Sequence, residues 1–176
     1  MMSKESLTQP SEYIRILAVD DDKGMMEFYT ELFKLKQPNC FVDQLSNLLF
    51  AGKMSTNPKQ QPLPILIQLG KAFSGKSGLA AMQKGVRIGK PYSVVLMDIR
   101  MPGGWDGVET AVKIRDEFPE TKFIFVTAYM QNNIEQLWNK FGINFSYLRK
   151  PFDRDEFLQQ VLLLGSSWLQ EKQAKI

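Results

Sequence analysis

Short, uniformly apolar segments constrain the fold of this chain most. They are rich in β-branched and aromatic residues with little polar alternation, which is typical of strands buried on both faces of a parallel sheet. Segments with apolar residues at helical spacing separate them. The strand segments are residues 14–19, 64–69, 93–97, 122–126 and 145–148. The helical segments are residues 23–36, 77–84, 108–118, 134–141 and about 153–172.

This alternation predicts a single α/β domain over residues 14–172 with a doubly wound parallel sheet, because parallel neighbours need crossover helices, which then cover both faces. Residues 1–13 are polar and aperiodic, and we expect them to form a disordered leader, with residues 173–176 as a short tail. Residues 37–62 are expected to form an insertion between the first helix and the second strand, since connections of this length are uncommon in compact domains.

The composition excludes several kinds of chemistry. The 176 residues include no histidine and one cysteine. Their absence rules out Ser-His-Asp and Cys-His catalysis, histidine-ligated metal sites and intramolecular disulfides. No apolar stretch approaches the roughly 20 residues that a membrane-spanning helix needs, and the amino terminus has no signal-peptide core. We therefore expect a cytoplasmic protein with no membrane partner.

The formal net charge is +3, a mild excess. The run from Lys71 to Lys90 contains basic residues and no acidic one. A nucleic-acid site would need these groups gathered on one face with aromatic residues between them. A solvated helix face is the interpretation we favour, so no direct nucleic-acid partner is expected.

Chemically active side chains stand at the ends of the predicted strands. Asp20 and Asp21 follow the first strand, Asp98 the third, Thr127 the fourth and Lys150 the fifth. In open α/β sheets the carboxyl ends of the strands border the functional crevice. Neighbouring carboxylates repel one another, so some carboxyl pKa should rise unless a cation such as Mg²⁺ binds. The sequence therefore predicts a site that combines carboxylates, a hydroxyl and an ammonium group.

Four motifs around these residues resemble the receiver domain of two-component response regulators. In chain order they are ILAVDDD, VVLMDIRMPGGWDG, FIFVTAY and YLRKPF. The resemblance implies a flavodoxin-like fold with five strands in the order 2-1-3-4-5. It also implies a phosphoacceptor signalling domain rather than an enzyme, with at most self-phosphorylation and self-dephosphorylation. The implied donor is a histidine kinase or a histidine phosphotransfer protein. A chain without histidine cannot supply a phosphohistidine itself, so the donor must be another molecule, another domain or a small acyl phosphate.

The resemblance assigns roles at the expected site. Asp98 would accept the phosphoryl group as an acyl phosphate, and Lys150 would neutralise a phosphoryl oxygen. Asp21 and Asp98 would ligate Mg²⁺ directly, with Mn²⁺ as an alternative ion. Asp20 would act on the metal through water, and Arg100 would supply its backbone carbonyl.

The resemblance also implies a switch and an output surface. Thr127 would hydrogen-bond the phosphoryl group, and Tyr147 would rotate inward when Thr127 moves. The output partner would be a downstream protein or a linked effector domain, contacted through the fourth predicted helix, the fifth strand and the fifth helix. Trp168 and Leu169, late in the last helix, suggest a dimer contact, with docking of this helix on the sheet as the alternative.

Two other interpretations compete with this one. The segment Gly70–Ser77 matches the P-loop pattern of nucleotide-binding proteins and lies between a predicted strand and a predicted helix. However, little more than one helix fits between it and Asp98, and a P-loop leaves the other strand-end residues without a role. Alternatively, Asp20 and Asp22 would be the nucleophile and the acid of a haloacid-dehalogenase-type phosphatase, in which Asp98 would be idle.

Overall fold

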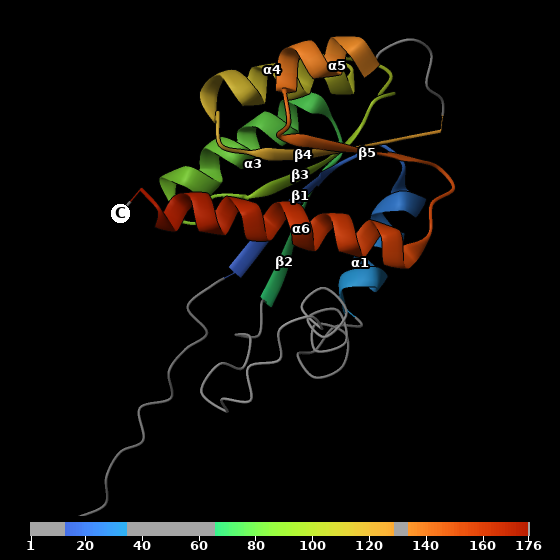
Figure 1. Ribbon diagram of the computed structural model, residues 1–176. Coiled ribbons are helices and arrows are strands. Elements are labelled where there is room, and N and C mark those ends of the chain that lie inside the picture. The colour runs from blue at the N-terminus through green and yellow to red at the C-terminus, as the bar shows by residue number, and fades with distance from the viewer. Residues whose placement is uncertain (1–12, 35–65, 129–133, 176) are drawn as a thin grey trace, which may run out of the picture.

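The structure is a computed structural model that describes residues 13–34, 66–128 and 134–175. Within these residues, strands and helices alternate along the chain (Figure 1). The strands are β1 (Tyr13–Val19), β2 (Leu66–Ala72), β3 (Val94–Asp98), β4 (Lys122–Thr127) and β5 (Phe145–Arg149). The helices are α1 (Lys23–Lys34), α3 (Gly75–Arg87), α4 (Gly107–Glu117), α5 (Ile134–Phe141) and α6 (Arg154–Gln173).

The strands form one parallel sheet in the order β2-β1-β3-β4-β5. This confirms the predicted doubly wound fold. The strand order reverses between β1 and β3, and ligands of such folds bind at this switch point, outside the carboxyl ends of the strands. Asp20 directly follows β1 and Asp98 ends β3, so both emerge at the switch point.

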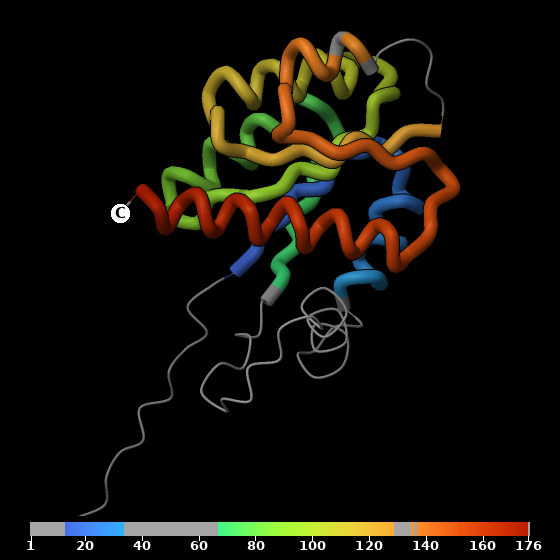
Figure 2. The backbone as a smooth tube through the Cα atoms, in the orientation of Figure 1, coloured from blue at the N-terminus to red at the C-terminus, as the bar shows by residue number. Residues whose placement is uncertain are grey.

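Helices cover both faces of the sheet, which explains the uniformly apolar strands. Alternate residues of β1 point to opposite faces, as the pleat of a strand requires. Ile14 and Ile16 belong to the core shared with α1 and α6, whereas Leu17 and Val19 belong to the core shared with α3, α4 and α5. The resulting three layers are visible in the backbone trace (Figure 2).

The second strand ends later than the sequence predicted. β2 continues to Ala72 instead of ending at Leu69, because Gly70 and Lys71 pair in register with Leu17 and Ala18 of β1. α3 then begins at Gly75, after a connection of only two residues. The glycine and lysine that look like the start of a loop are therefore part of the sheet.

Parts of the predicted domain organisation lie outside the described residues. These are the whole insertion at residues 37–62 and the leader, apart from Tyr13, which begins β1. At the other end, α6 extends through Gln173, the first residue of the predicted tail. Within the described residues, no helix combines the length and the apolar character that crossing a bilayer requires.

Candidate functional site

Three carboxylates meet at the carboxyl ends of β1 and β3. One oxygen from each of Asp20, Asp21 and Asp98 lies within 4.8 Å of the other two. The side chains differ in burial: Asp20 is 1% exposed and Asp98 is 9% exposed, whereas Asp21 is open to solvent. The cluster forms because β1 and β3, far apart in sequence, are neighbours in the sheet.

The ammonium group of Lys150 reaches this cluster from the end of β5. Its Nζ donates hydrogen bonds to Oδ2 of Asp20 at 3.0 Å and to Oδ1 of Asp98 at 3.4 Å. Its backbone N–H donates to the carbonyl of Thr127 at 2.7 Å, which ties the end of β5 to the end of β4. The peptide bond from Lys150 to Pro151 is cis.

The electrostatics of the site favour a bound cation. Burial raises the pKa of the Asp98 carboxyl to about 6, because the charged form loses its hydration. The charges of Asp20 and Asp21 also raise this pKa, whereas the nearby ammonium of Lys150 lowers it. Burial, followed by the charges of Asp20 and Asp98, also raises the pKa of the Tyr29 hydroxyl on α1 above its ordinary value. One lysine therefore balances only part of the negative charge of three carboxylates.

The third aspartate of the DDD motif has a structural role. Oδ1 of Asp22 accepts hydrogen bonds from the backbone N–H groups of Gly24 at 2.7 Å and Met25 at 3.3 Å. This is the arrangement of a helix N-cap, and it starts α1. The N–H of Asp22 in turn donates to Oδ1 of Asp20 at 2.9 Å, which fixes the orientation of that buried carboxylate.

The backbone that carries Asp98 is held by a close approach to Gly107. The N–H of Gly107 donates to the carbonyl of Ile99 at 2.9 Å. A Cβ atom at position 107 would lie only 2.0 Å from the carbonyl oxygen of Asp98, so no side chain fits there. Sequence reasoning missed this role of Gly107, although a glycine directly before a helical segment hinted at a close contact.

The other predicted site residues lie at the same edge of the sheet or near it. Thr127 is buried at the end of β4, the strand that pairs with β3. Arg100 is exposed two residues after Asp98. Tyr147 is half-buried in β5 opposite Phe125 and packs against the core below α4 and α5. The structure thus brings the carboxylates and Lys150 into direct contact and places Thr127 on the adjacent strand.

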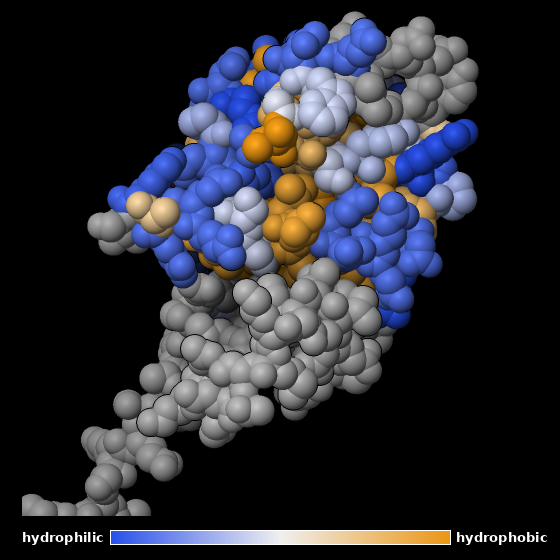
Figure 3. Space-filling view, in the orientation of Figure 1, coloured by the Kyte–Doolittle hydropathy of each residue, from blue (hydrophilic) through white to orange (hydrophobic). Residues whose placement is uncertain are grey.

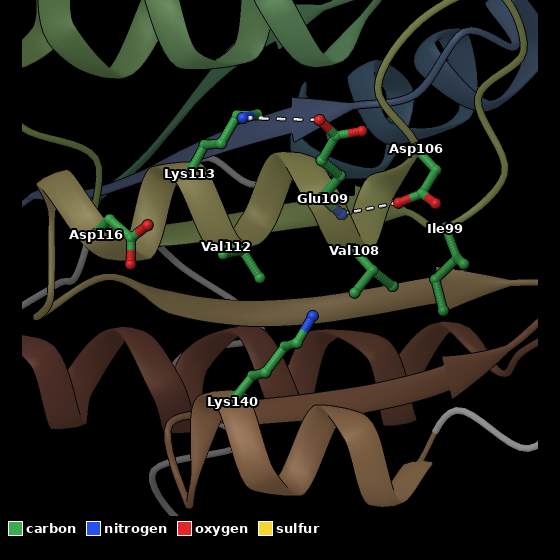
Figure 4. Close-up of a pocket in the computed structure, with 8 residues that line it drawn as sticks. All are labelled: Ile99, Asp106, Val108, Glu109, Val112, Lys113, Asp116 and Lys140. Atoms are coloured by element: carbon green, nitrogen blue, oxygen red, sulfur yellow. Dashed lines mark hydrogen bonds and ion pairs between the residues drawn. The ribbon is translucent and has the colours of Figure 1, made fainter.

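A groove of about 380 Å³ lies beside the cluster, between α4 and α5 (Figure 4). Its lining includes Ile99 and Val108, and Lys140 extends into it from α5 toward α4. An ion pair between Lys113 and Glu109, with the nitrogen and oxygen 3.6 Å apart, lies on the α4 side. The groove begins one residue after Asp98 but is not lined by the three clustered carboxylates.

The P-loop interpretation is not supported. Only Phe73 and Ser74 separate β2 from α3. Ser74 and Ser77 bond to each other as a capping box, in which the N–H of Ser77 donates to Oγ of Ser74 at 3.3 Å. A P-loop needs a longer phosphate-binding loop and a serine hydroxyl directed at Mg²⁺. Gly70 instead leaves room for the ring of Tyr92, whose hydroxyl would lie 2.3 Å from a Cβ atom there.

The phosphatase interpretation is not supported either. It requires Asp22 to act as an acid beside Asp20, but the carboxylate of Asp22 is exposed and accepts the hydrogen bonds that cap α1. Asp98 lies inside the carboxylate cluster and contacts Lys150, a position that this interpretation leaves without a purpose.

Comparison with protein families gives one match. The model of the response regulator receiver domain matches residues 63–162, more than half of the chain. The matched part contains Asp98, Thr127 and Lys150. β1 and the residues after it, Asp20 and Asp21, precede the match, yet β1 lies in the same sheet between β2 and β3.

Solved structures share the fold. A response regulator receiver domain protein (CheY-like) from Methanospirillum hungatei JF-1 is 20% identical with a TM-score of 0.64, covering 91% of this chain and 99% of that one. The receiver domain of the Francisella response regulator 1452 is 24% identical with a TM-score of 0.59, and the match covers 87% of this chain and 97% of that one. A chain of the CheX-CheY-BeF3-Mg²⁺ complex from Borrelia burgdorferi is 20% identical with a TM-score of 0.57, and the match covers 86% of this chain and 88% of that one.

Proposed function

Because the chain belongs to the response regulator receiver domain family, and is thus a receiver domain of two-component signalling, we propose that Asp98 is its phosphoacceptor. The observation that carries this proposal is the convergence of Asp20, Asp21, Asp98 and Lys150 at the switch point of the sheet. Asp98 is the member of the cluster that ends a central strand and contacts the lysine. Asp21, in contrast, is exposed.

The reaction transfers a phosphoryl group from a partner. A carboxylate oxygen of Asp98 attacks the phosphorus of a phosphohistidine, the P–N bond breaks, and an acyl phosphate forms. The leaving imidazole nitrogen takes a proton from solvent. The donor is a histidine kinase or a histidine phosphotransfer protein, since this chain has no histidine. With a pKa of about 6, the Asp98 carboxyl is mostly ionised at neutral pH and can attack.

The donor set of the site fits Mg²⁺, with Mn²⁺ as an alternative. Mg²⁺ prefers oxygen ligands and binds through one or two carboxylates while keeping several waters. Asp21, Asp98 and the backbone carbonyl of Arg100 would hold the ion, and Asp20 would act through water. The ion, when bound, neutralises charge on the phosphoryl oxygens. The Borrelia CheY complex contains Mg²⁺ and BeF3, which supports Mg²⁺ as the ion.

Lys150 and Thr127 act on the transferred group. Asp20 holds the Lys150 ammonium 3.0 Å from its own carboxylate, at the edge where the phosphoryl oxygens arrive. A positioned ammonium stabilises charge that develops during transfer. The Thr127 hydroxyl would bond a phosphoryl oxygen, and Tyr147, half-buried on the next strand, would change its packing in response.

The output surface would be the face of α5, β5 and α6. Apolar side chains gather on this side of the molecule (Figure 3). Trp138 of α5 and Leu163 of α6 are 55% and 63% exposed. This face would contact a downstream protein or a linked effector domain. Trp168 is buried, so a dimer through α6 would use Leu163 instead.

Intact-mass measurement after incubation with acetyl phosphate and Mg²⁺ tests the proposal. One phosphoryl adduct is expected, and it should disappear in Asp98→Asn and when Mg²⁺ is chelated. Asp22→Asn is the matched control and should keep the adduct. An adduct that persists in Asp98→Asn, or that is lost in Asp22→Asn, contradicts the proposed acceptor.

A further inference from the structure

The connection from β5 to α6 is short, and it is anchored in the core by an aromatic side chain. It comprises residues 150–153. Pro151 and Asp153 are exposed, whereas Phe152 is half-buried and packs against the apolar core that the sheet shares with α1 and α6. Lys150 is the first residue of this connection. The chain is therefore anchored only two residues beyond the lysine that contacts the carboxylate cluster.

The Phe152 ring belongs to a stack of aromatic rings. It stacks on the ring of Phe157 in α6, with the centroids 5.2 Å apart and an angle of 21° between the planes. The ring of Phe157 stacks in turn on that of Tyr29 in α1, at 5.7 Å and 20°. Phe28 of α1 also meets the Phe152 ring edge-on at 5.8 Å. Because aromatic pairs prefer defined relative orientations, these contacts fix Phe152 relative to α1.

The α1 end of the stack lies near the carboxylates. α1 begins directly after the three consecutive aspartates, and Asp22 caps it. Tyr29 is 1% exposed, and burial raises the pKa of its hydroxyl, as do the charges of Asp20 and Asp98. Coulombic interaction falls with distance, so the Tyr29 side chain lies close to the two carboxylates that Lys150 contacts. The stack thus joins the chain after Lys150 to the helix that follows Asp20.

The backbone of Lys150 is held on both sides. Its N–H donates to the carbonyl of Thr127 at 2.7 Å, which fixes it to β4, and Phe152 anchors the chain that leaves it. The side chain itself is a flexible four-carbon stem, so the backbone must define where the ammonium group lies. A displacement of about 1 Å in a reacting group can cost about 100-fold in rate. The anchor at Phe152 is therefore placed to influence the reaction through the lysine.

We propose that Phe152 is a positioning residue for phosphoryl transfer. Its stacking on Phe157 holds the backbone of Lys150 in the place from which the ammonium contacts Asp20 and Asp98. When the ring is lost, the lysine samples other positions, and fewer molecules present the ammonium to the incoming phosphoryl oxygens. This role rests on the proposed function of Asp98 as the acceptor, and it adds a residue that acts only through the lysine.

The rate of adduct formation with acetyl phosphate and Mg²⁺, followed by intact mass, tests this role. Phe152→Leu stays apolar but removes the ring, and it should slow the reaction about tenfold, less than complete loss of the ammonium. Phe152→Tyr keeps the ring and should stay within about twofold of the unaltered chain. Phe33→Leu is the matched control, because Phe33 contacts Phe157 at 6.0 Å from a position further along α1. It should also stay within about twofold, and urea unfolding shows that each variant is folded in the assay.

A second measurement separates positioning of the lysine from a general loosening of the fold. In Lys150→Met, which lacks the ammonium, adding Phe152→Leu should change the rate less than about twofold, because residues that act as one unit have non-additive effects. A slowing that persists in Lys150→Met, or an equal slowing in Phe33→Leu, overturns the role of Phe152. An unchanged rate in Phe152→Leu overturns this role alone, whereas an unaltered chain that forms no adduct overturns the proposed function and this role together.

Discussion

The Asp98 carboxyl group occupies an environment that disfavours its own charge. It is 9% exposed and lies beside two other carboxylates, and Lys150 is the ammonium group that contacts it. The resulting pKa of about 6 lies above the value near 3.8 of an unperturbed aspartate. Such a site stores unfavourable electrostatic energy that a cation, or removal of the charge, would release.

This environment predicts a pH-dependent gain in stability for Asp98→Asn. Between about pH 4 and pH 6 the folded protein keeps a proton on Asp98 that the unfolded chain releases, so the contribution of Asp98 to stability falls as the pH rises through this window. Above pH 6 the full cost of the buried charge remains. In chelator, the free energy of unfolding in urea should therefore rise by about 1–2 kcal/mol in Asp98→Asn at pH 8, with almost no gain at pH 4.

Asp116→Asn is the control for this prediction, because it removes an exposed carboxylate and should change stability little at either pH. A gain in Asp98→Asn that is equal at both pH values, or larger at pH 4, would mean that the charge of Asp98 is not the cause.

Lys150 and Lys76 give a paired prediction that separates two interpretations of the sequence. The ammonium of Lys150 contacts Asp20 and Asp98, whereas Lys76 is exposed on α3. Loss of one positioned charge at a reacting group costs about 100-fold in rate. Lys150→Met should slow adduct formation with acetyl phosphate by about that factor, and Lys76→Met should stay within about twofold. A comparable loss in Lys76→Met would favour the P-loop interpretation.

The convergence of the strand-end residues could be predicted from the sequence, but the environment of each side chain could not. Asp20, Asp98 and Lys150 each follow an apolar strand, and the topology of a parallel sheet brings strand ends together. Whether an aspartate is buried, like Asp20, or exposed, like Asp21, depends on the strands packed beside it. The capping role of Asp22 was missed because three consecutive aspartates look alike in sequence.

At the level of elements, the connection from β3 to α4 sets the position of Asp98. The N–H of Gly107 closes this connection on the carbonyl of Ile99, and Asp106 caps α4 by accepting from the N–H of Glu109 at 2.7 Å. The carbonyl of Asp98 lies where a Cβ of residue 107 would be. The backbone of Asp98 and the start of α4 are therefore held in contact with each other.

Gly107→Ala should disrupt this contact. The added methyl group must displace the backbone of Asp98, and overpacking of a buried site typically costs about 1–3 kcal/mol. Urea unfolding should report a loss of that size, with slower adduct formation. Gly104→Ala is the matched control in the same connection, since a Cβ there meets nothing within 4 Å. Equal effects of the two substitutions would contradict the proposed close approach.

Segment boundaries were predicted well where local signals decide them and poorly where pairing decides them. α5 has the bounds expected from its apolar spacing. β2 extends past its apolar run through Ala72, because β1 offers backbone partners to Gly70 and Lys71. The segment that matches the P-loop pattern thus folds as the end of a strand followed by a capped helix. Only the pairing of β2 with β1 decides between this structure and a phosphate-binding loop.

At the level of the whole molecule, the sheet gathers its charged strand-end side chains at one edge. The carboxylate cluster lies at the carboxyl edge of the sheet. Figure 1 shows that α6 runs along one face of the sheet. The far end of α6 is fixed by the buried ammonium of Lys122, which lies 2.6 Å from Oε1 of Glu171. The fold class followed from the alternation of strands and helices, but the contact between Lys122 and Glu171 became evident only in three dimensions.

Chemical mapping of the phosphoryl group tests the central claim most directly. Borohydride reduces an aspartyl phosphate to homoserine, which peptide mass spectrometry locates. After incubation with acetyl phosphate and Mg²⁺, followed by reduction, the account predicts homoserine at position 98 alone. Homoserine at position 20, 21 or 22, or a phosphoryl adduct that yields no homoserine, would contradict it.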